Sequence, residues 1–291
     1  MTAITTTDLT KYYGKSRGIL NLNLTVEEGD FFGFIGPNGA GKSTTIRILL
    51  GLISPSGGTA QIFGRDIRTH KKDILADVGY MPSEAAFYSN MRVSEVLRFS
   101  ANLRGQDCSA EGTQLCRRLA LDTEKKISQL SLGNRKKVSI VCALQHNPRL
   151  CILDEPTSGL DPLMQREFYA ILEERNAAGT TIFLSSHVLS EVQRHCKHAA
   201  VIRAGQILVS DSIDNLGQTH AKQVTLRGVS APPVLDGIKN ISTDGKCVTF
   251  LYSGVPARLL QSLAAIPLTD VTISEPDLED IFMHYYEKED A

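Results

Sequence analysis

Apolar runs of strand length alternate with amphipathic, helix-like stretches from the N-terminus to about residue 210. The runs that we expect to be strands are Ile4–Leu9, Leu20–Val26, Phe31–Ile35, Thr59–Ile62, Val78–Met81, Leu150–Leu153, Thr180–Leu184, Ala199–Arg203 and Ile207–Val209. The last two flank Ala204-Gly205-Gln206, which is typical of a hairpin. Alternating strands and helices predict an α/β fold with a mostly parallel sheet and ligand sites at the carboxyl ends of its strands.

The strands stop between about Glu84 and His146. Helical stretches follow one another there, at Val93–Leu97, Thr113–Leu121 and Arg135–Gln145. This block, residues 84–146, predicts a helical insert within the α/β core.

A further helix has clear ends. Asp161 is suited to the N-cap, Pro162 to the first helical position and Gly179 to the end of the helix. One face of this helix is apolar and is expected in the core, with Met164, Phe168, Ile171 and Leu172.

Past Asn215 the character of the sequence changes. Lys222–Arg227 and Lys246–Tyr252 alternate like strands, whereas Val255–Ile266 and Asp277–Tyr286 have helical periodicity. We therefore predict an α/β domain over residues 1–215 and a small α+β appendage over residues 216–291. The last helix has an apolar stripe of Leu278, Ile281, Phe282 and Tyr285. We expect it to pack on its own domain, with contact to another chain as the alternative.

The overall charge gives no sign of a nucleic-acid partner. The 291 residues carry a net charge of −1, so no global basic field is present. The basic run Asn134-Arg135-Lys136-Lys137 is expected to be a solvated helix face. We therefore expect no direct binding of nucleic acid.

Cysteine usage and hydropathy indicate a cytoplasmic protein. The six cysteines are scattered without a C-x-x-C pair, which is typical of reduced thiols. His195-Cys196-Lys197-His198 is expected to be a helix end with a buried cysteine and solvated histidines, not a metal cluster. We expect neither a secretory signal nor a membrane span, because no apolar run approaches the ~20 residues that a span needs.

A glycine-rich loop directly follows the apolar run Phe31–Ile35. It has the pattern G-x-x-x-x-G-K-[ST] between a strand and a helix, which is typical of a loop that holds nucleotide phosphates. The loop consists of Gly36, Pro37, Asn38, Gly39, Ala40, Gly41, Lys42 and Ser43, and Thr44 follows it. Its backbone N–H groups form a nest for phosphate oxygens, Lys42 reaches the β- and γ-phosphates, and Ser43 can ligate magnesium. By itself this loop indicates a nucleoside triphosphate, in a kinase, a GTPase or a motor ATPase.

Two carboxylates end the apolar run Leu150–Leu153. A buried strand with acids at its carboxyl end places them beside the phosphates. Asp154 is expected to hold magnesium opposite Ser43, and Glu155 to act as general base on the attacking water.

Three further segments complete a recognisable set. Pro156–Pro162 follows the acids, Leu130–Asn134 precedes them by about twenty residues, and Ser185-Ser186-His187 comes about thirty residues after them. Over residues 4–215 the chain resembles the ABC ATPase family, and most closely the ATP-binding subunits of ABC-2-type exporters, drug and antibiotic exporters among them. The segment Glu275–Phe282 is also similar to the end of those subunits. The resemblance implies a P-loop NTPase fold: a mostly parallel sheet, an N-terminal antiparallel β part, a helical insert and a small C-terminal α+β appendage.

The resemblance also implies roles for individual residues. Tyr13 matches the aromatic residue that stacks on adenine, with Tyr12 as the alternative. His187 matches the switch histidine that contacts the γ-phosphate and couples it to Glu155, and Asp161 belongs to a loop that crosses the dimer interface. Ser131, Gly133 and Asn134 match the signature that closes on ATP held by another subunit. Lys42, Glu155 and His187 would then catalyse ATP hydrolysis with Mg²⁺, in a head-to-tail homodimer around two ATP molecules.

Two positions depart from the family pattern. Leu132 replaces the first glycine of the usual L-S-G-G-Q signature and Asn134 its glutamine, which weakens the expected closure. Ser83 stands where glutamine or glutamate is usual, and it is too short to reach the metal except through water, so Glu84 is its alternate.

The expected function is the energising subunit of an ABC exporter. The subunit is expected on the inner face of the cell membrane, with separate polytopic membrane subunits docked near residues 85–104. The alternative is a soluble ABC-type ATPase that acts on ribosomes, DNA or protein complexes. A kinase or GTPase is disfavoured, since the sequence has no N-K-x-D guanine reader and such enzymes leave Ser131–Asn134 and His187 unexplained.

Overall fold

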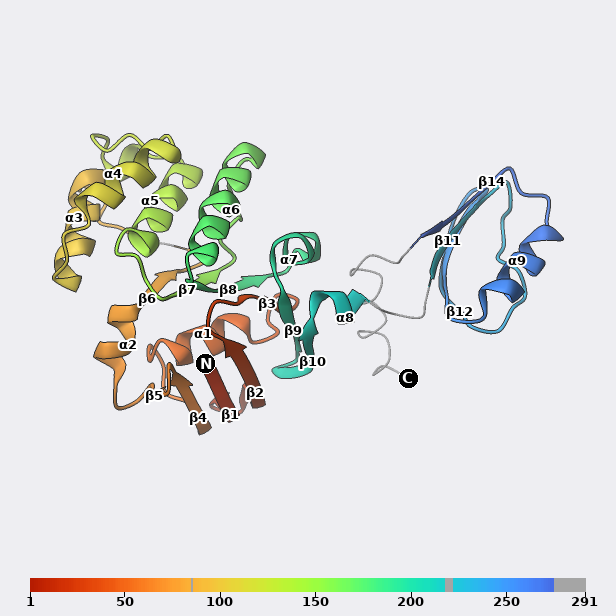
Figure 1. Ribbon diagram of the computed structural model, residues 1–291, viewed down its shortest axis with the longest axis horizontal. Coiled ribbons are helices and arrows are strands. Elements are labelled where there is room, and N and C mark those ends of the chain that lie inside the picture. The colour runs from red at the N-terminus through yellow and green to blue at the C-terminus, as the bar shows by residue number, and fades with distance from the viewer. Residues whose placement is uncertain (85, 218–221, 275–291) are drawn as a thin grey trace. The chain divides into compact units, whose positions relative to one another are not determined.

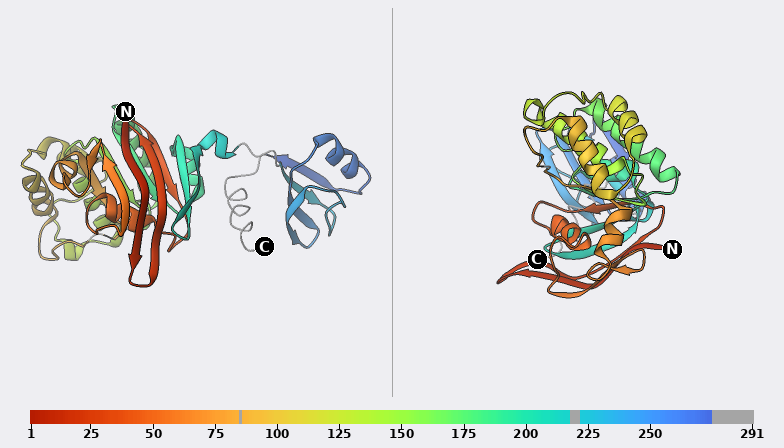
Figure 2. Two further views of the ribbon diagram at one scale, coloured as in Figure 1. Left: turned by 90° about the horizontal axis from the view of Figure 1, so that it is seen from below. Right: turned by 90° about the vertical axis from the view of Figure 1, so that its left-hand side faces the viewer.

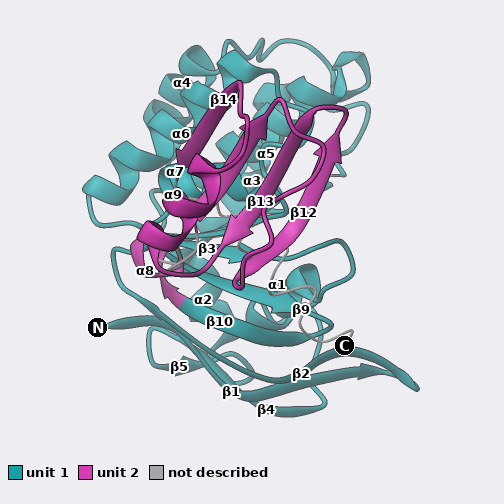
Figure 3. Cartoon of the chain, turned by 90° about the vertical axis from the view of Figure 1, so that its right-hand side faces the viewer, with its two compact units in different colours: residues 1–210 teal, residues 211–291 magenta. Residues whose placement is uncertain are grey.

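The chain divides between Ser210 and Asp211 into two units, which Figure 3 colours separately. The computed structural model describes residues 1–84, 86–217 and 222–274. The predicted helix Asp277–Tyr286 lies outside these residues.

A six-stranded sheet forms the centre of the first unit (Figure 1). In spatial order its strands are β10 (Gln206–Ser212), β9 (His198–Arg203), β3 (Phe31–Ile35), β8 (Thr181–Ser186), β7 (Leu150–Asp154) and β6 (Val78–Met81). β3 pairs in parallel with β8 and β9, and β7 pairs in parallel with β6 and β8. Every residue of β3, β7 and β8 is buried, as expected for strands covered on both faces. The mostly parallel sheet predicted from the sequence is confirmed.

The predicted hairpin at the edge of this sheet is also confirmed. Ala204 and Gly205 alone separate β9 from β10, and both have a positive φ, 48° and 81°. Positive φ at both central residues is the geometry of a type I′ turn, whose twist matches that of the flanking strands.

A second sheet, antiparallel, covers the other side of helix α1 (Lys42–Leu49). Its order is β2 (Ser16–Glu27), β1 (Thr2–Tyr13), β4 (Gly57–Ile62) and β5 (Arg65–Asp66). Figure 2 shows β1 and β2 as a long two-stranded ribbon. Apolar side chains of both sheets and of α1 join in one core cluster, with Ile4, Leu22, Phe34, Ile46 and Phe183 among its members. This arrangement fixes α1 and the loop before it between the two sheets.

Helices occupy the stretch between β6 and β7. They are α3 (Val93–Arg104), α4 (Ser109–Arg118), the 3₁₀ helix Ile127–Gln129 and α5 (Leu132–Leu144), while α2 (Lys71–Asp77) precedes β6. α5 lies against α3, α4 and β6, so it joins the insert to the sheet. The predicted helical insert is confirmed as part of the fold.

Two helices follow β7 and β8. α6 (Pro162–Ala177) begins at Asp161, whose Oδ1 accepts a hydrogen bond from the backbone N–H of Met164 at 3.0 Å. Gly179 follows it with φ 102°, and Phe168, Ile171 and Leu172 are buried, as the sequence predicts. Met164, which was also expected in the core, is only half-buried in the first turn of the helix. α7 (Leu189–His195) follows β8.

The segment His195–His198 differs in part from its prediction. Cys196 is buried, as expected. His195, however, is not solvated, because its ring stacks on Tyr169 with centroids 3.7 Å apart and its Nδ1 lies 2.8 Å from a carboxylate oxygen of Glu173. His198 pairs with Asp30 instead, so the two histidines have separate partners.

The second unit contains an antiparallel sheet with one helix on it. Its strands lie in the order β12 (Ile238–Asp244), β13 (Cys247–Tyr252), β11 (Lys222–Arg227) and β14 (Asp270–Ser274), and its helices are α8 (Ile213–Gly217) and α9 (Pro256–Ala264). Alternate side chains of β11 and β13 pack on Leu259 and Leu263 of α9. This confirms the predicted α+β character, although the sequence reading missed β12 and β14, whose side chains are mostly exposed.

None of the helices in the three described ranges is both long and apolar enough to cross a bilayer.

Candidate active site

The glycine-rich loop connects β3 to α1 and curls around the ammonium group of Lys42. Gly39 and Gly41 have φ values of 81° and 113°, a region that side chains disfavour. A Cβ on Gly36 would lie 2.3 Å from the carbonyl oxygen of Ile202, so neighbouring backbone excludes a side chain there. The sheet packing and the loop curvature therefore both require these glycines.

Lys42 is the first residue of α1 and is only 5 % exposed. Its Nζ donates to the carbonyl oxygens of Gly36 at 2.6 Å and Pro37 at 3.2 Å. The same Nζ lies 3.2 Å from Oε1 of Glu155. A buried ammonium thus faces the inside of the loop, where it can bind an anion.

A cavity of about 230 Å³ opens beside the loop. It is lined by Tyr13, Arg17, Gly18, Asn38, Gly39, Gly41, Lys42, Ser43, Thr44 and Glu155. Tyr13 is therefore at the cavity, whereas Tyr12, its alternative, is not among the lining residues. Of the other predicted loop residues, Gly36, Pro37 and Ala40 are not among the lining residues; Gly36 and Ala40 are buried and Pro37 is exposed.

Sequence reasoning missed Arg17 and Gly18 in this cavity. Both belong to β2, and Arg17 lies opposite Tyr12 in the β1–β2 register. The turn at Gly14 is a sequence signal that could have found them. A hairpin there places the start of β2 beside Tyr13.

The two predicted acids lie at the carboxyl end of β7. Asp154 is 2 % exposed, and its Oδ1 accepts a hydrogen bond from Ser185 Oγ at 2.6 Å. Glu155 has φ 47°, and its N–H donates to the carbonyl oxygen and to Oγ of Ser185, both at 3.1 Å. Ser185, which sequence reasoning did not single out as a separate site residue, therefore orients both acids from β8.

His187 follows β8 and is half-exposed. Its Nδ1 lies 3.4 Å from Oε1 of Glu155, the same oxygen that faces Lys42. The structure thus brings Lys42, Glu155 and His187 together around one carboxylate. Such a cluster can bind a phosphate group and hold a water molecule against it.

Glu191 of α7 links the segments on either side of this cluster. Its Oε2 accepts hydrogen bonds from Thr157 Oγ1 at 3.1 Å and from Ser186 Oγ at 3.2 Å. Thr157 follows Glu155 by two residues and Ser186 precedes His187, so one carboxylate links side chains from both neighbouring segments. No sequence signal had marked Glu191.

The remaining predicted residues lie away from the cavity. Ser131 caps α5, with its Oγ accepting from the N–H of Asn134 at 3.3 Å, and Gly133 follows it in the first turn. A Cβ on Gly133 would lie 3.1 Å from the carbonyl oxygen of Gly159, so the start of α5 contacts the loop that leads to Asp161. None of Ser131, Gly133, Asn134 and Asp161 lines the cavity beside Lys42.

Ser83 and Glu84 follow β6 and are likewise not among the cavity residues. The carbonyl oxygen of Ser83 accepts a hydrogen bond from Lys136 Nζ at 2.7 Å. This contact corrects the prediction for the basic run, because Lys136 is buried and not part of a solvated face. Burial lowers the pKa of Lys136, an effect that the nearby Glu155, Asp154 and Glu84 oppose.

Known proteins resemble this chain in both sequence and fold. The family model for the ABC transporter matches residues 19–158. The bacitracin transport ATP-binding protein BcrA of Bacillus licheniformis is 35% identical, over 97% of this chain and 96% of its own length. A probable multidrug ABC transporter ATP-binding protein of Escherichia coli, YbhF, is 32% identical over 74% of this chain and 38% of its own. A solved ATP-binding subunit of an ABC transporter superposes with a TM-score of 0.69 at 30% identity, over 74% of this chain and 91% of that one.

The family of this chain follows from three observations: the phosphate loop, the acidic strand end and a relative matched along almost its whole length. The chain belongs to the ABC transporter family, as an ATP-binding subunit that hydrolyses ATP.

Proposed function

We propose that this protein energises an ABC exporter through ATP-driven, head-to-tail pairing of two copies. The observation that carries the proposal is the separation of two residue sets within one chain: Lys42 and Glu155 line the nucleotide cavity, whereas Ser131 and Gly133 do not. The cavity of about 230 Å³ is also smaller than the roughly 300–1,000 Å³ of typical small-molecule sites, which supports a site that a second chain completes. We assign this activity to residues 1–215, with residues 216–291 as an accessory domain.

Within each site, one chain binds and activates the nucleotide. Tyr13 stacks on adenine at the mouth of the cavity, the loop from Gly36 to Thr44 holds the phosphates, and Lys42 neutralises their charge. Glu155 accepts a proton from the attacking water, and His187 orients the γ-phosphate against it. The short contacts of Glu155 Oε1 to Lys42 and His187 support this division of roles.

The residues at the end of β7 fit a magnesium ion. The Asp154 carboxylate is buried and its orientation is fixed by Ser185, and carboxylate and hydroxyl oxygens are the ligands that Mg²⁺ prefers. We propose that Asp154 and Ser43 hold the ion, with Ser83 as a contact through water and Glu84 as its alternate. When bound, the ion balances negative charge on the β- and γ-phosphates.

Ser131, Gly133 and Asn134 of the second copy close the site, and Asp161 lies in the loop that crosses between the copies. ATP can drive this closure only because it binds the closed pair better than the separate chains. Hydrolysis and phosphate release remove that difference, and the copies part.

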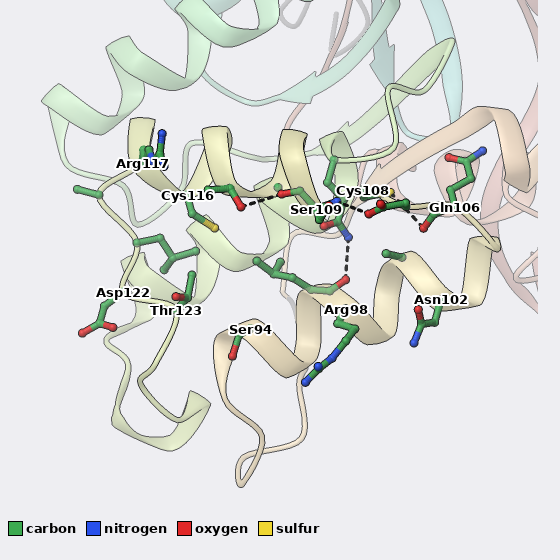
Figure 4. Close-up of a pocket in the computed structure, with 18 of the residues that line it drawn as sticks. Ser94, Arg98, Asn102, Gln106, Cys108, Ser109, Cys116, Arg117, Asp122 and Thr123 are labelled. Carbon is green, nitrogen blue, oxygen red and sulfur yellow. Dashed lines mark hydrogen bonds between the residues drawn. The ribbon is translucent and has the colours of Figure 1, made fainter.

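A large cavity in the helical insert supports a docking site for the membrane subunits. It measures about 1180 Å³ and lies between α3, α4 and the end of α5. Figure 4 shows α3 with Arg98 and Asn102 on one side of it, and α4 with Cys116 and Arg117 on the other. Apolar Leu97, Ala101 and Leu121 line the same cavity. An amphipathic segment of a membrane subunit matches this mixture of apolar and charged groups, and it would hold the protein on the inner face of the membrane.

The general base is tested by Glu155→Gln. We expect ATP binding to persist while turnover falls by about 10²–10⁴-fold, the range that general-base catalysis supplies. Steady-state phosphate release and equilibrium nucleotide binding measure the two quantities, and Glu173→Gln is the matched control on α6. Unimpaired turnover of the Glu155 variant would remove Glu155 as the base.

The coupling is tested by co-purification of the full chain from membranes. We expect a polytopic membrane protein to accompany the wild-type chain, and Arg98→Glu in the insert to weaken that association while the chain keeps its melting temperature. A pool of wild-type protein that is bound to ribosomes or nucleic acid, with no membrane protein attached, would favour the alternative function.

A further inference from the structure

Lys136 is a buried cation that the proposed chemistry does not use. It lies in the first turns of α5 and is 5 % exposed, whereas its neighbour Arg135 is exposed and Lys137 is half-buried. Burial of an ammonium group is unfavourable unless hydrogen bonds replace its water. The partners of Lys136 therefore indicate why the residue is there.

Those partners are two backbone carbonyl groups from different parts of the chain. The Nζ of Lys136 donates to the carbonyl oxygen of Ser83 at 2.7 Å and to that of Glu155 at 3.1 Å. The ammonium group of Lys136 thus connects α5, the loop after β6 and the residue directly after β7. Hydrogen bonds from a charged donor are stronger than those between neutral groups, and more so where water is excluded.

The backbone of Glu155 is in a conformation that needs such support. Its φ of 47° lies in the left-handed region, which is unfavourable for a residue with a side chain and persists only where surrounding contacts impose it. Ser185 holds the N–H of Glu155 from one side, and Lys136 holds its carbonyl oxygen from the other. The direction of the Glu155 side chain follows from this backbone conformation.

We propose that Lys136 is a positioning residue for ATP hydrolysis: it fixes the peptide of Glu155 so that the carboxylate stays beside Lys42 and His187, and it ties that peptide to the loop at Ser83. The inference rests on the proposed role of Glu155 as general base. Because the bond goes to the carbonyl group of Ser83, the link does not depend on the serine side chain. One hydrogen-bonded side chain therefore links α5 of the helical insert to the peptide of Glu155.

The test compares Lys136→Met with Lys136→Gln in the full chain. Methionine keeps the length of the side chain but removes its donors, and we expect kcat to fall at least about tenfold while the Kd for ATP changes less than about twofold. Glutamine retains an N–H donor, and we expect its kcat within about threefold of wild type. Lys137→Met, which removes the same charge from the same helix, is the control and should leave kcat close to wild type.

A double variant separates this role from a general effect on the site. Lys136→Met added to Glu155→Gln should reduce the residual rate by less than about twofold, because a residue that acts through Glu155 has nothing left to position. The proposal is wrong if Lys136→Met keeps its kcat, if the double variant loses a further factor of about ten, or if both Lys136 variants fail to bind ATP. Normal turnover of Glu155→Gln alone would instead disprove the base assignment, whatever the Lys136 variants do.

Discussion

In the proposed function, the nucleotide cavity and the signature turn (Ser131–Asn134, at the start of α5) form two parts of one ATP site. They differ in how many polar contacts their residues already make within one chain. In the cavity, Lys42 is buried and contacts two carbonyl groups and the Glu155 carboxylate. At the signature turn, Ser131 is exposed and accepts from its own helix, and Leu132 is 63 % exposed. The first half is preorganised by its own chain. The second presents donors and an apolar side chain outwards, as expected of a surface that a partner covers.

We therefore expect variants of the two regions to affect different steps. Changes in the cavity should affect the binding of ATP to a single chain. Changes at the signature turn should leave that binding intact and affect only what two chains do together.

After Glu155→Gln, the largest effect is expected from Lys42→Ala, which removes the cation inside the phosphate loop. We expect kcat/KM for ATP to fall by about 10²–10³-fold, the effect of losing a preorganised charge partner in a closed site. Nucleotide affinity should fall as well, because the phosphates lose their ammonium group. Lys71→Ala is a matched control, since that lysine is exposed and donates to the carbonyl oxygen of Gly51. Retained activity in Lys42→Ala would contradict the role of the loop.

A smaller, selective effect is expected from Ser131→Ala. We expect about a tenfold lower turnover with an unchanged Kd for ATP on the isolated chain, since only the second copy would use this hydroxyl. The same change also removes the N-cap of α5. Ser131→Asn therefore serves as the control for loss of the helix cap, because asparagine caps a helix as well as serine does. If ATP binding to single chains weakens in proportion to turnover, the two halves are not separate.

The smallest effect is expected from Tyr13→Ala, which removes the aromatic face at the cavity mouth. Stacking of a base on an aromatic ring contributes about 1–3 kcal/mol. Because Tyr13 is 46 % exposed, we expect the lower end of this range, a rise of about fivefold in the Kd for ATP with kcat little changed. Tyr12→Ala is the matched control, because Tyr12 is as exposed as Tyr13 but does not line the cavity. Equal effects of the two changes, measured by titration with a fluorescent nucleotide, would remove Tyr13 from its proposed role.

The residues of the nucleotide cavity could be predicted from the sequence because most of them lie in short, contiguous motifs. The loop from Gly36 to Ser43 has a fixed spacing, and Asp154 and Glu155 follow a buried strand directly. The strand–helix alternation was equally readable, since the central strands β3, β7 and β8 are buried over their whole length.

The tertiary contacts could not be predicted in this way. Lys136 stands in a basic run on an amphipathic helix, and only the packing of α5 against β6 buries it. Glu191 reaches the segments beside the site from α7, a separate helix with no motif of its own. The edge strand β14 shows little burial, so its pattern of alternation carried no signal.

The central claim is that a second copy completes the ATP site, and sedimentation of Glu155→Gln with and without ATP tests it most directly. We predict monomers without nucleotide and dimers with ATP, with one nucleotide bound per chain. Gly133→Asp in the same background, which places a side chain against Gly159, should bind ATP and remain monomeric. Monomers that hold ATP without pairing, or dimers that persist after Gly133→Asp, would contradict the account.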